Sequence, residues 1–387
     1  MKKTTHEQTK IHNMRLILRT IYGNSTISRA DVARITKLTP TTVSDLTEGL
    51  IADGLVAEVG FGVSIGGKPP TLLSVPSDAR IAVGIDLGDS ELRGSLINLR
   101  GETLYSASLP GNLKGDEAVN QVIALIDLLL EHVDRKVFLG IGLGSPGLVS
   151  LEDGVVRRAV KYQWQEVPLK AILQQKYSVP VAIANDSHVA ALAEYIYGID
   201  PNEENLVLLK VGEGISAGLI LSGKIFAGDG SGAGEIGHVS VEPNGQPCRC
   251  GHIGCLETVA SLRALAQMTR EVFSEVNGMS NDAILDRLVR ELEEGNPESI
   301  QIARRAGEYL GLAVANIVGL LNIHKIVLAG PISTLGDVLT ESIVASMQEK
   351  ALDTLSRQTQ ILVSKLGTNI VQIGAAALVQ QTTLGLF

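Results

Sequence analysis

Aromatic residues make up only 3% of this 387-residue chain, which argues against a surface that binds single-stranded nucleic acid by base stacking. No stretch approaches the roughly 20 consecutive apolar residues that span a bilayer, and the first residues are polar. The chain has 3 cysteines, too few for a disulfide framework. Hydrophobic residues reach 45%, enough for several cores. We therefore expect a cytoplasmic, globular protein of two or three domains with no membrane partner.

Charge is distributed unevenly along the chain. The whole sequence carries −9, a sign that opposes binding to the polyanion DNA. Residues 1–80, however, contain 10 Lys and Arg against 7 Asp and Glu, a net charge of +3, so the remainder carries −12. This asymmetry predicts a small module that faces nucleic acid, fused to an acidic body.

The first 80 residues show the pattern of three helices and a wing. Apolar residues recur at helical spacing from Ile11 to Ile21, and Ser28 and Thr39 are expected N-caps of a second and a third helix. Two β-prone runs, 55–59 and 71–75, are joined by a long tip. The pattern predicts a winged helix-turn-helix that binds double-stranded DNA; the alternative is a three-helix protein-interaction module.

The third helix is the expected reading element of this module. Its predicted inner face comprises Val43, Leu46 and Leu50. Small hydroxyl residues at its N-terminal end can reach phosphates and base edges in the major groove. Asp45, on the predicted outer face, does not suit a DNA contact. The predicted DNA-binding residues of the helix are Thr41, Thr42 and Ser44.

From residue 81 onward, β-prone runs alternate with helical patterns. The expected strands lie at 81–86, 91–99, 137–143 and 181–184, with helices at 119–133 and 187–197. The pattern then restarts, with strands at 206–211, 217–221 and 325–328 and mostly helical sequence after 262. A body of two mixed α/β lobes is therefore expected.

All of the cysteines lie within eight residues, which indicates a metal site in preference to three incidental thiols. With one histidine they complete the four ligands of a closed, structural, tetrahedral zinc site. Gly251 and Gly254 allow the loop to fold around an ion, and His252 is a rival nitrogen ligand. The predicted zinc ligands are His238, Cys248, Cys250 and Cys255.

Carboxylates gather near this cluster in the sequence. Asn185 and Asp186 follow an expected strand, Glu235 precedes His238 by three residues, and Glu257 follows the last cysteine. Carboxylates, an amide and an imidazole suit the vicinal hydroxyls of a sugar; otherwise these are solvated loop acids. His238 is expected to use one ring nitrogen on zinc and the other toward the ligand.

These motifs, in this order, resemble the ROK family of repressors and sugar kinases. The matching stretches are Gly84-Ile85-Asp86-Leu87-Gly88, Gly142 to Gly147, Asn185-Asp186, Gly234 to His238 and Cys248 to Glu257. The resemblance implies an α/β fold: a winged helix-turn-helix at 1–80, then a two-lobed actin-like, ribonuclease-H-like sugar kinase body. Its first lobe spans 81–200 and is completed by 374–387, and its second lobe spans 201–373 with the zinc loop. By resemblance, the sugar-binding residues are Asn185, Asp186, Glu235, His238 and Glu257.

The segments that match the kinases' nucleotide loops depart from the kinase pattern. Asp89 and Glu91 add carboxylates to the first phosphate loop, and Glu213 adds one to the second. The adenosine-side Gly-Gly-Gly is replaced by residues 329–331, which end in Pro331. Asp186, the kinases' general base, then lacks a phosphoryl donor and is expected to contact ligand only. These departures predict a protein that is not an enzyme; the alternative is an ATP-dependent, glucokinase-like sugar kinase.

The resemblance thus implies a sugar-responsive repressor of carbohydrate-utilisation genes, and among effectors we favour a xylose-type sugar. Its expected partners are double-stranded operator DNA, a small sugar and a second copy of the chain, as a homodimer or tetramer. A transport-system protein is the alternative regulatory partner. Lys68, after two glycines in the wing, resembles a basic residue that family repressors place near the minor groove.

Overall fold

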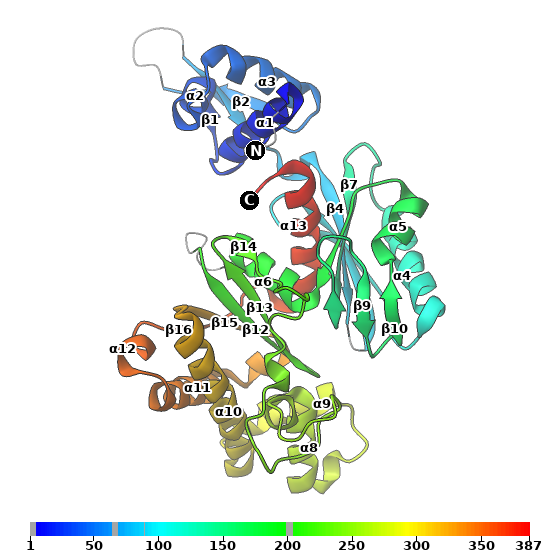
Figure 1. The fold of residues 1–387 in the computed structure, drawn as a ribbon, viewed down its shortest axis with the longest axis vertical. Helices are drawn as coiled ribbons and strands as arrows, with labels where there is room; N and C mark the ends of the chain where they lie inside the picture. The colour runs from blue at the N-terminus through cyan, green and yellow to red at the C-terminus, as the bar shows by residue number, and fades with distance from the viewer. Residues whose placement is uncertain (1–4, 64–68, 89, 199–203) are drawn as a thin grey trace.

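The computed structural model describes residues 5–63, 69–88, 90–198 and 204–387 (Figure 1). Lys68 and Asp89, which have predicted roles, lie outside these ranges. Within the described ranges, no helix combines the length and apolar character that crossing a membrane requires.

The N-terminal module forms the predicted helices and wing. Ser28 accepts a hydrogen bond from the Asp31 backbone N–H at 3.1 Å, and Thr39 accepts one from Thr42 at 3.2 Å, so both predicted N-caps are confirmed. The small sheet has the order β1-β3-β2. Its elements are α1 (His6–Tyr22), β1 (Ile27–Ser28), α2 (Arg29–Thr36), α3 (Pro40–Ala52), β2 (Ala57–Phe61) and β3 (Thr71–Ser74).

The inner face of α3 differs in part from the prediction. Val43 and Leu50 are buried as expected, but Thr47 is buried where Leu46 was expected, and Leu46 is half-buried. The buried residues of α3 share a core with Val32 of α2 and Leu73 of β3. The Thr47 hydroxyl is buried there with no hydrogen-bond partner among the described residues.

The first sheet of the body has the order β11-β7-β4-β5-β6. β4 runs parallel to β7 and antiparallel to β5. Val83 and Ile85 on one face pack with α4 and α5, whereas Ala82 on the other face packs with α6 and α13. The elements are β4 (Ile81–Leu87), β5 (Glu91–Asn98), β6 (Thr103–Pro110), α4 (Gly115–Leu130), β7 (Phe138–Ser145), α5 (Leu169–Tyr177), β11 (Val181–Asn185) and α6 (Asp186–Tyr197). A small sheet beside it contains β8 (Leu148–Val149), β9 (Val156–Ala159) and β10 (Trp164–Val167).

The second sheet has the order β14-β13-β12-β15-β16 and is covered by a helical layer. Its strands are β12 (Leu206–Val211), β13 (Ile215–Leu221), β14 (Lys224–Ile225), β15 (Lys325–Ala329) and β16 (Gln360–Val363). The helices are α7 (Glu257–Ala260), α8 (Leu262–Val272), α9 (Asn281–Glu293), α10 (Pro297–Leu321), α11 (Gly336–Lys350) and α12 (Asp353–Ser356). The predicted restart of the α/β pattern near residue 206 is confirmed.

Helices α6 and α13 (Ile370–Leu384) lie between the two large sheets (Figure 1). Glycines make this close packing possible: a Cβ at Gly84 would stand 2.0 Å from the Gln372 carbonyl oxygen, and one at Gly142 would stand 1.7 Å from that of Ala375. The C-terminal helix therefore packs on the first sheet, and it begins at Ile370 and ends at Leu384.

The last three residues contact both the N-terminal module and the body, where the Phe387 ring lies 5.8 Å from that of Tyr197. Leu386 is buried in that module's core, and Arg19 of α1 donates to the Gly385 carbonyl oxygen at 3.0 Å. The Phe387 ring packs edge-on against Tyr22 of α1, with ring centroids 5.4 Å apart. The chain terminus thus connects the body to the N-terminal module.

Candidate functional site

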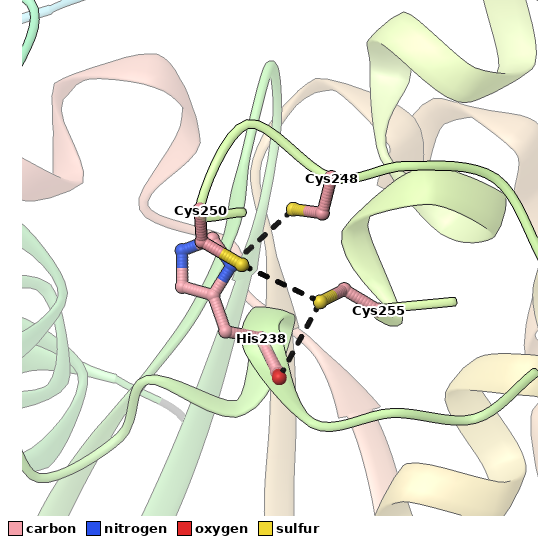
Figure 2. Close-up of side chains that lie close together, drawn as sticks. All are labelled: His238, Cys248, Cys250 and Cys255. Carbon is pink, nitrogen blue, oxygen red and sulfur yellow. Dashed lines mark hydrogen bonds between the residues drawn. The ribbon is translucent and has the colours of Figure 1, made fainter. Parts of the chain in front are cut away.

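The histidine and cysteines of the predicted metal cluster (His238, Cys248, Cys250 and Cys255) come together. Their ligand atoms all lie within 4.8 Å of one another (Figure 2). Cys248 Sγ lies 3.6 Å from His238 Nδ1, and Cys250 Sγ lies 3.6 Å from Cys255 Sγ. Three thiol groups and one imidazole form the donor set of a tetrahedral structural zinc site, so these residues fit the predicted ion.

The loop that carries the cysteines depends on its glycines. Gly251 and Gly254 have φ angles of +96° and +70°, and a Cβ at Gly254 would stand 1.6 Å from the Glu242 carbonyl oxygen. His252 Nδ1 lies 3.4 Å from Cys250 Sγ, but the converging nitrogen is that of His238. Hydrogen bonds from the backbone and side chain of His252 lower the pKa of Cys250 to about 6. Burial raises the pKa of Cys255 to about 12.

Beside the metal cluster lies a group of carboxylates, the acid cluster (Asp186, Glu235 and Glu257). Burial raises the pKa of Glu235; the charges of Asp186 and Glu257 raise it further, while those of His238 and Arg249 oppose the rise. These groups are therefore close enough to affect one another. His238 connects the two clusters, because its Nδ1 faces Cys248 and its Nε2 lies 4.0 Å from a Glu235 carboxylate oxygen.

Asn185 and Asp186 lie at the junction of β11 and α6. Asn185 caps α6 by accepting from the Ser187 backbone N–H at 2.9 Å, and it donates to the Gly147 carbonyl oxygen at 2.9 Å. Asp186 forms an ion pair with Lys210 of β12 at 2.5 Å. Lys210 was missed in the sequence, because its contact with Asp186 arises only when the second sheet packs against α6.

A further buried carboxylate, Asp86, lies near this ion pair. Arg93, directly opposite it on β5, pairs with Asp86 Oδ2 at 2.8 Å, while Oδ1 has no hydrogen-bond partner among the described residues. Burial raises the pKa of Asp86, and the positive charges of Lys210 and Arg93 oppose that rise.

Glu257 is the most enclosed member of the acid cluster, with a side chain 2% exposed. It pairs with two arginines. Arg249, between two cysteines of the metal cluster, places Nε 2.8 Å from Oε1 and Nη2 3.0 Å from Oε2. Arg263, in the first turn of α8, donates to Oε1 at 2.8 Å. Both arginines were missed, because nothing in their local sequence distinguishes them from solvated loop and helix residues.

The predicted nucleotide loops make contacts within the chain. Glu213 accepts a hydrogen bond from Asn281 of α9 at 2.8 Å. A Cβ on Gly212 would stand 3.6 Å from the Pro331 ring. Pro331 therefore packs against the predicted second phosphate loop, which contains Gly212. Glu91 is exposed at the start of β5.

The predicted DNA-binding residues lie at the N-terminal end of α3. Thr41 is exposed, and Thr42 and Ser44 are half-buried. The Thr42 hydroxyl lies 2.8 Å from that of Thr39, so it also supports the helix cap. Asp45 is exposed on the same helix.

Comparison with known proteins agrees with this architecture. Residues 82–382 match the ROK family model, and residues 12–57 match a model described as winged helix-turn-helix DNA-binding. The chain is 34% identical to a xylose repressor of Caldicellulosiruptor bescii, over 97% of this chain and 96% of the relative. It is 29% identical to an N-acetylglucosamine repressor of Escherichia coli O157:H7, over 96% of this chain and 93% of the relative.

A solved structure matches with a TM-score of 0.85 and 26% identity, covering 97% of each chain. It is described as a ROK family transcriptional regulator, a homologue of the E. coli MLC protein. The fold and the matches define a transcriptional regulator in which a winged helix-turn-helix precedes a sugar kinase-type body. The chain belongs to the ROK family.

Proposed function

We propose that this ROK regulator is a sugar-responsive repressor whose N-terminal module holds operator DNA and whose body binds a small sugar. The observation that carries the proposal is the convergence of the acid cluster with His238, in a chain that also contains the DNA-binding module. Carboxylates and imidazole accept hydrogen bonds from adjacent hydroxyl groups, which a sugar supplies in pairs.

Within this site, Asn185, Asp186 and Glu235 contact sugar hydroxyl groups, and Asn185 also caps the start of α6. His238 contributes Nε2 on the side that faces Glu235. Glu257 completes the set. The full-length similarity to a xylose repressor supports a xylose-type effector.

The metal cluster holds one structural zinc ion in this proposal. Bound zinc stabilises the loop and leaves no open position for a reacting water, because four protein ligands complete its shell. His238, once its Nδ1 is a ligand, has a fixed ring orientation toward the acid cluster. The ion therefore positions a sugar contact.

On the DNA side, α3 enters the major groove, where Thr41, Thr42 and Ser44 contact phosphates and base edges. Lys68 of the wing contacts the DNA at the minor groove. Two copies of the chain are required, as a dimer or within a tetramer, because a pseudo-palindromic operator presents paired half-sites. Sugar weakens operator binding if it prefers the DNA-free geometry by about 1 to 3 kcal/mol.

We propose that the protein does not transfer phosphoryl groups. Asp186, the counterpart of the kinases' general base, forms an ion pair with Lys210 of β12. Pro331 packs against Gly212 in the second phosphate loop.

Calorimetric titration of the full chain with D-xylose, D-glucose and N-acetylglucosamine tests the proposal, together with an ADP-release assay over the same sugars. We expect binding of at least one sugar and no ADP release. Turnover of any sugar would establish a kinase instead. Absence of heat and of a thermal shift with every sugar would favour regulation by a protein partner.

A further inference from the structure

We propose that Arg249 competes with the sugar for Glu257 and must leave that carboxylate when sugar binds. The inference rests on the proposed function, since it concerns one residue of the proposed sugar site. It starts from a limit of chemistry: the two oxygens of a carboxylate offer about four acceptor positions.

In Glu257 these positions are filled by the protein itself. Arg249 approaches both oxygens, at 2.8 and 3.0 Å, and Arg263 approaches Oε1 at 2.8 Å. The backbone N–H of Ile215 lies 3.4 Å from Oε2. A sugar hydroxyl therefore gains a good hydrogen bond to Glu257 only if one of these nitrogen atoms withdraws.

Arg249 is the partner best placed to withdraw. Ile215 donates from the backbone of β13, and Arg263 projects from the capped first turn of α8. The two arginine side chains are similarly exposed, at 52% for Arg249 and 43% for Arg263, but Arg249 comes from a loop instead of a helix, so its guanidinium can turn into water at little cost. Because Arg249 contacts both oxygens, its departure opens an acceptor position on each of them.

Arg263 makes this exchange tolerable for a buried acid. A carboxylate that is 2% exposed needs a cation nearby, since an unpaired buried charge is strongly unfavourable. Arg263 remains on Oε1 after Arg249 leaves, so Glu257 keeps a cationic partner. Because Glu257 pairs with two arginines, hydroxyl groups of the sugar can replace Arg249 while Arg263 stays in place.

The backbone of Arg249 is held between Cys248 and Cys250 of the metal cluster. The Arg249 guanidinium lies against the predicted second phosphate loop, residues 212–214, because a Cβ on Gly214 would stand 2.8 Å from Arg249 Nη2. The metal cluster thus holds the backbone of Arg249 in place, while its exposed side chain can turn away from Glu257. Sugar binding exchanges the Arg249 contact and leaves the metal ligands in place.

Titration of Arg249→Ala with the same three sugars tests this inference. We expect Kd for the bound sugar to fall roughly two- to fivefold, as for release of one partly exposed ion pair. Arg249→Lys, which keeps the charge but offers a single contact point, should give a smaller decrease. Arg357→Ala, which removes an arginine paired only with exposed Asp353 among the described residues, is the matched control and should leave Kd unchanged.

Metal content of each variant is measured alongside and should stay at the wild-type level. A crystal structure of the wild-type sugar complex should show a hydroxyl group on Glu257 and Arg249 turned away. Unchanged or weaker binding by both Arg249 variants, or a sugar complex in which Arg249 still pairs with Glu257, would overturn the inference alone. Failure of wild type and variants to bind any sugar would overturn the proposed function as well.

Discussion

At the scale of residues, acidic groups of the body lie beside basic groups of the same chain. Asp86 pairs with Arg93, Asp186 with Lys210, and Glu257 with two arginines. Charge complementarity of this kind gives each enclosed carboxylate a cationic partner within the chain.

The acids of this region were predictable from the sequence, but their basic partners were not. Asp186, Glu235 and Glu257 stand in short motifs of recognisable spacing. Lys210 and Arg249 become partners only through tertiary packing, and no local pattern encodes that. The cysteines were predictable because they are few and adjacent, which fixes their mutual distance before any fold is known.

Cys250→Ser tests the metal ligands directly. We expect this variant to lose its metal, because a serine hydroxyl is a far poorer zinc ligand than a thiolate. His252→Ala is the matched control, since it removes the neighbouring imidazole that approaches the same sulfur. Elemental analysis should give one zinc per chain for wild type and His252→Ala. Full zinc in Cys250→Ser would refute Cys250 as a ligand, and loss of zinc in His252→Ala would refute the choice of His238 over His252.

His188 provides a test of pH dependence. It is buried on α6, it contacts the Ala233 carbonyl oxygen at 3.0 Å, and burial lowers its pKa. Below about pH 6.5, His188 therefore binds a proton more readily in the unfolded chain than in the folded one. The free energy of unfolding falls as the pH drops below that value.

The loss attributable to His188 has an upper limit of about 1.4 kcal/mol per pH unit. His188→Gln keeps a donor for Ala233 and removes the titration, so its unfolding free energy should decline less between pH 7 and 5.5. Denaturant unfolding at several pH values measures this, and parallel declines in both proteins would contradict it.

At the scale of elements, α13 shares one hydrophobic core with residues of both large sheets of the body. It packs against α6 and the first sheet through small residues, and Gly374 approaches α6 so closely that a Cβ would stand 1.7 Å from the Val189 carbonyl oxygen. The sequence predicted most strands and helices here from periodicity. It could not predict the order of the strands, nor that the helix begins at Ile370, because both depend on packing between distant segments.

A pair of glycine substitutions tests this packing. Gly374→Ala places a methyl group against α6 and should destabilise the protein markedly. A Cβ at Gly319, in α10, would meet no atom of the described residues within 4 Å, so Gly319→Ala should stabilise the protein by about 0.5–1 kcal/mol through helix propensity. Thermal unfolding of the two variants distinguishes the effects, and a stabilising Gly374→Ala would show that α13 is not closely packed.

At the scale of the whole molecule, the chain terminus connects the body to the DNA-binding module. Leu386 is buried among residues of that module, and α13 immediately before it runs between the two large sheets (Figure 1). A change in the body that moves α13 therefore acts on α1, against which residues 385–387 pack. The sequence predicts that 374–387 completes the first lobe, but a short apolar tail carries no signal for contact with the N-terminal module.

The central claim is that sugar bound in the body changes how the N-terminal module binds DNA. Its most direct test is fluorescence anisotropy of the full chain with a duplex selected from random sequences, measured with and without the sugar that calorimetry identifies. We predict tight binding to a pseudo-palindromic site and a change in Kd of roughly 5- to 150-fold on adding sugar. Equal affinity for that site with saturating sugar and with none would contradict the account.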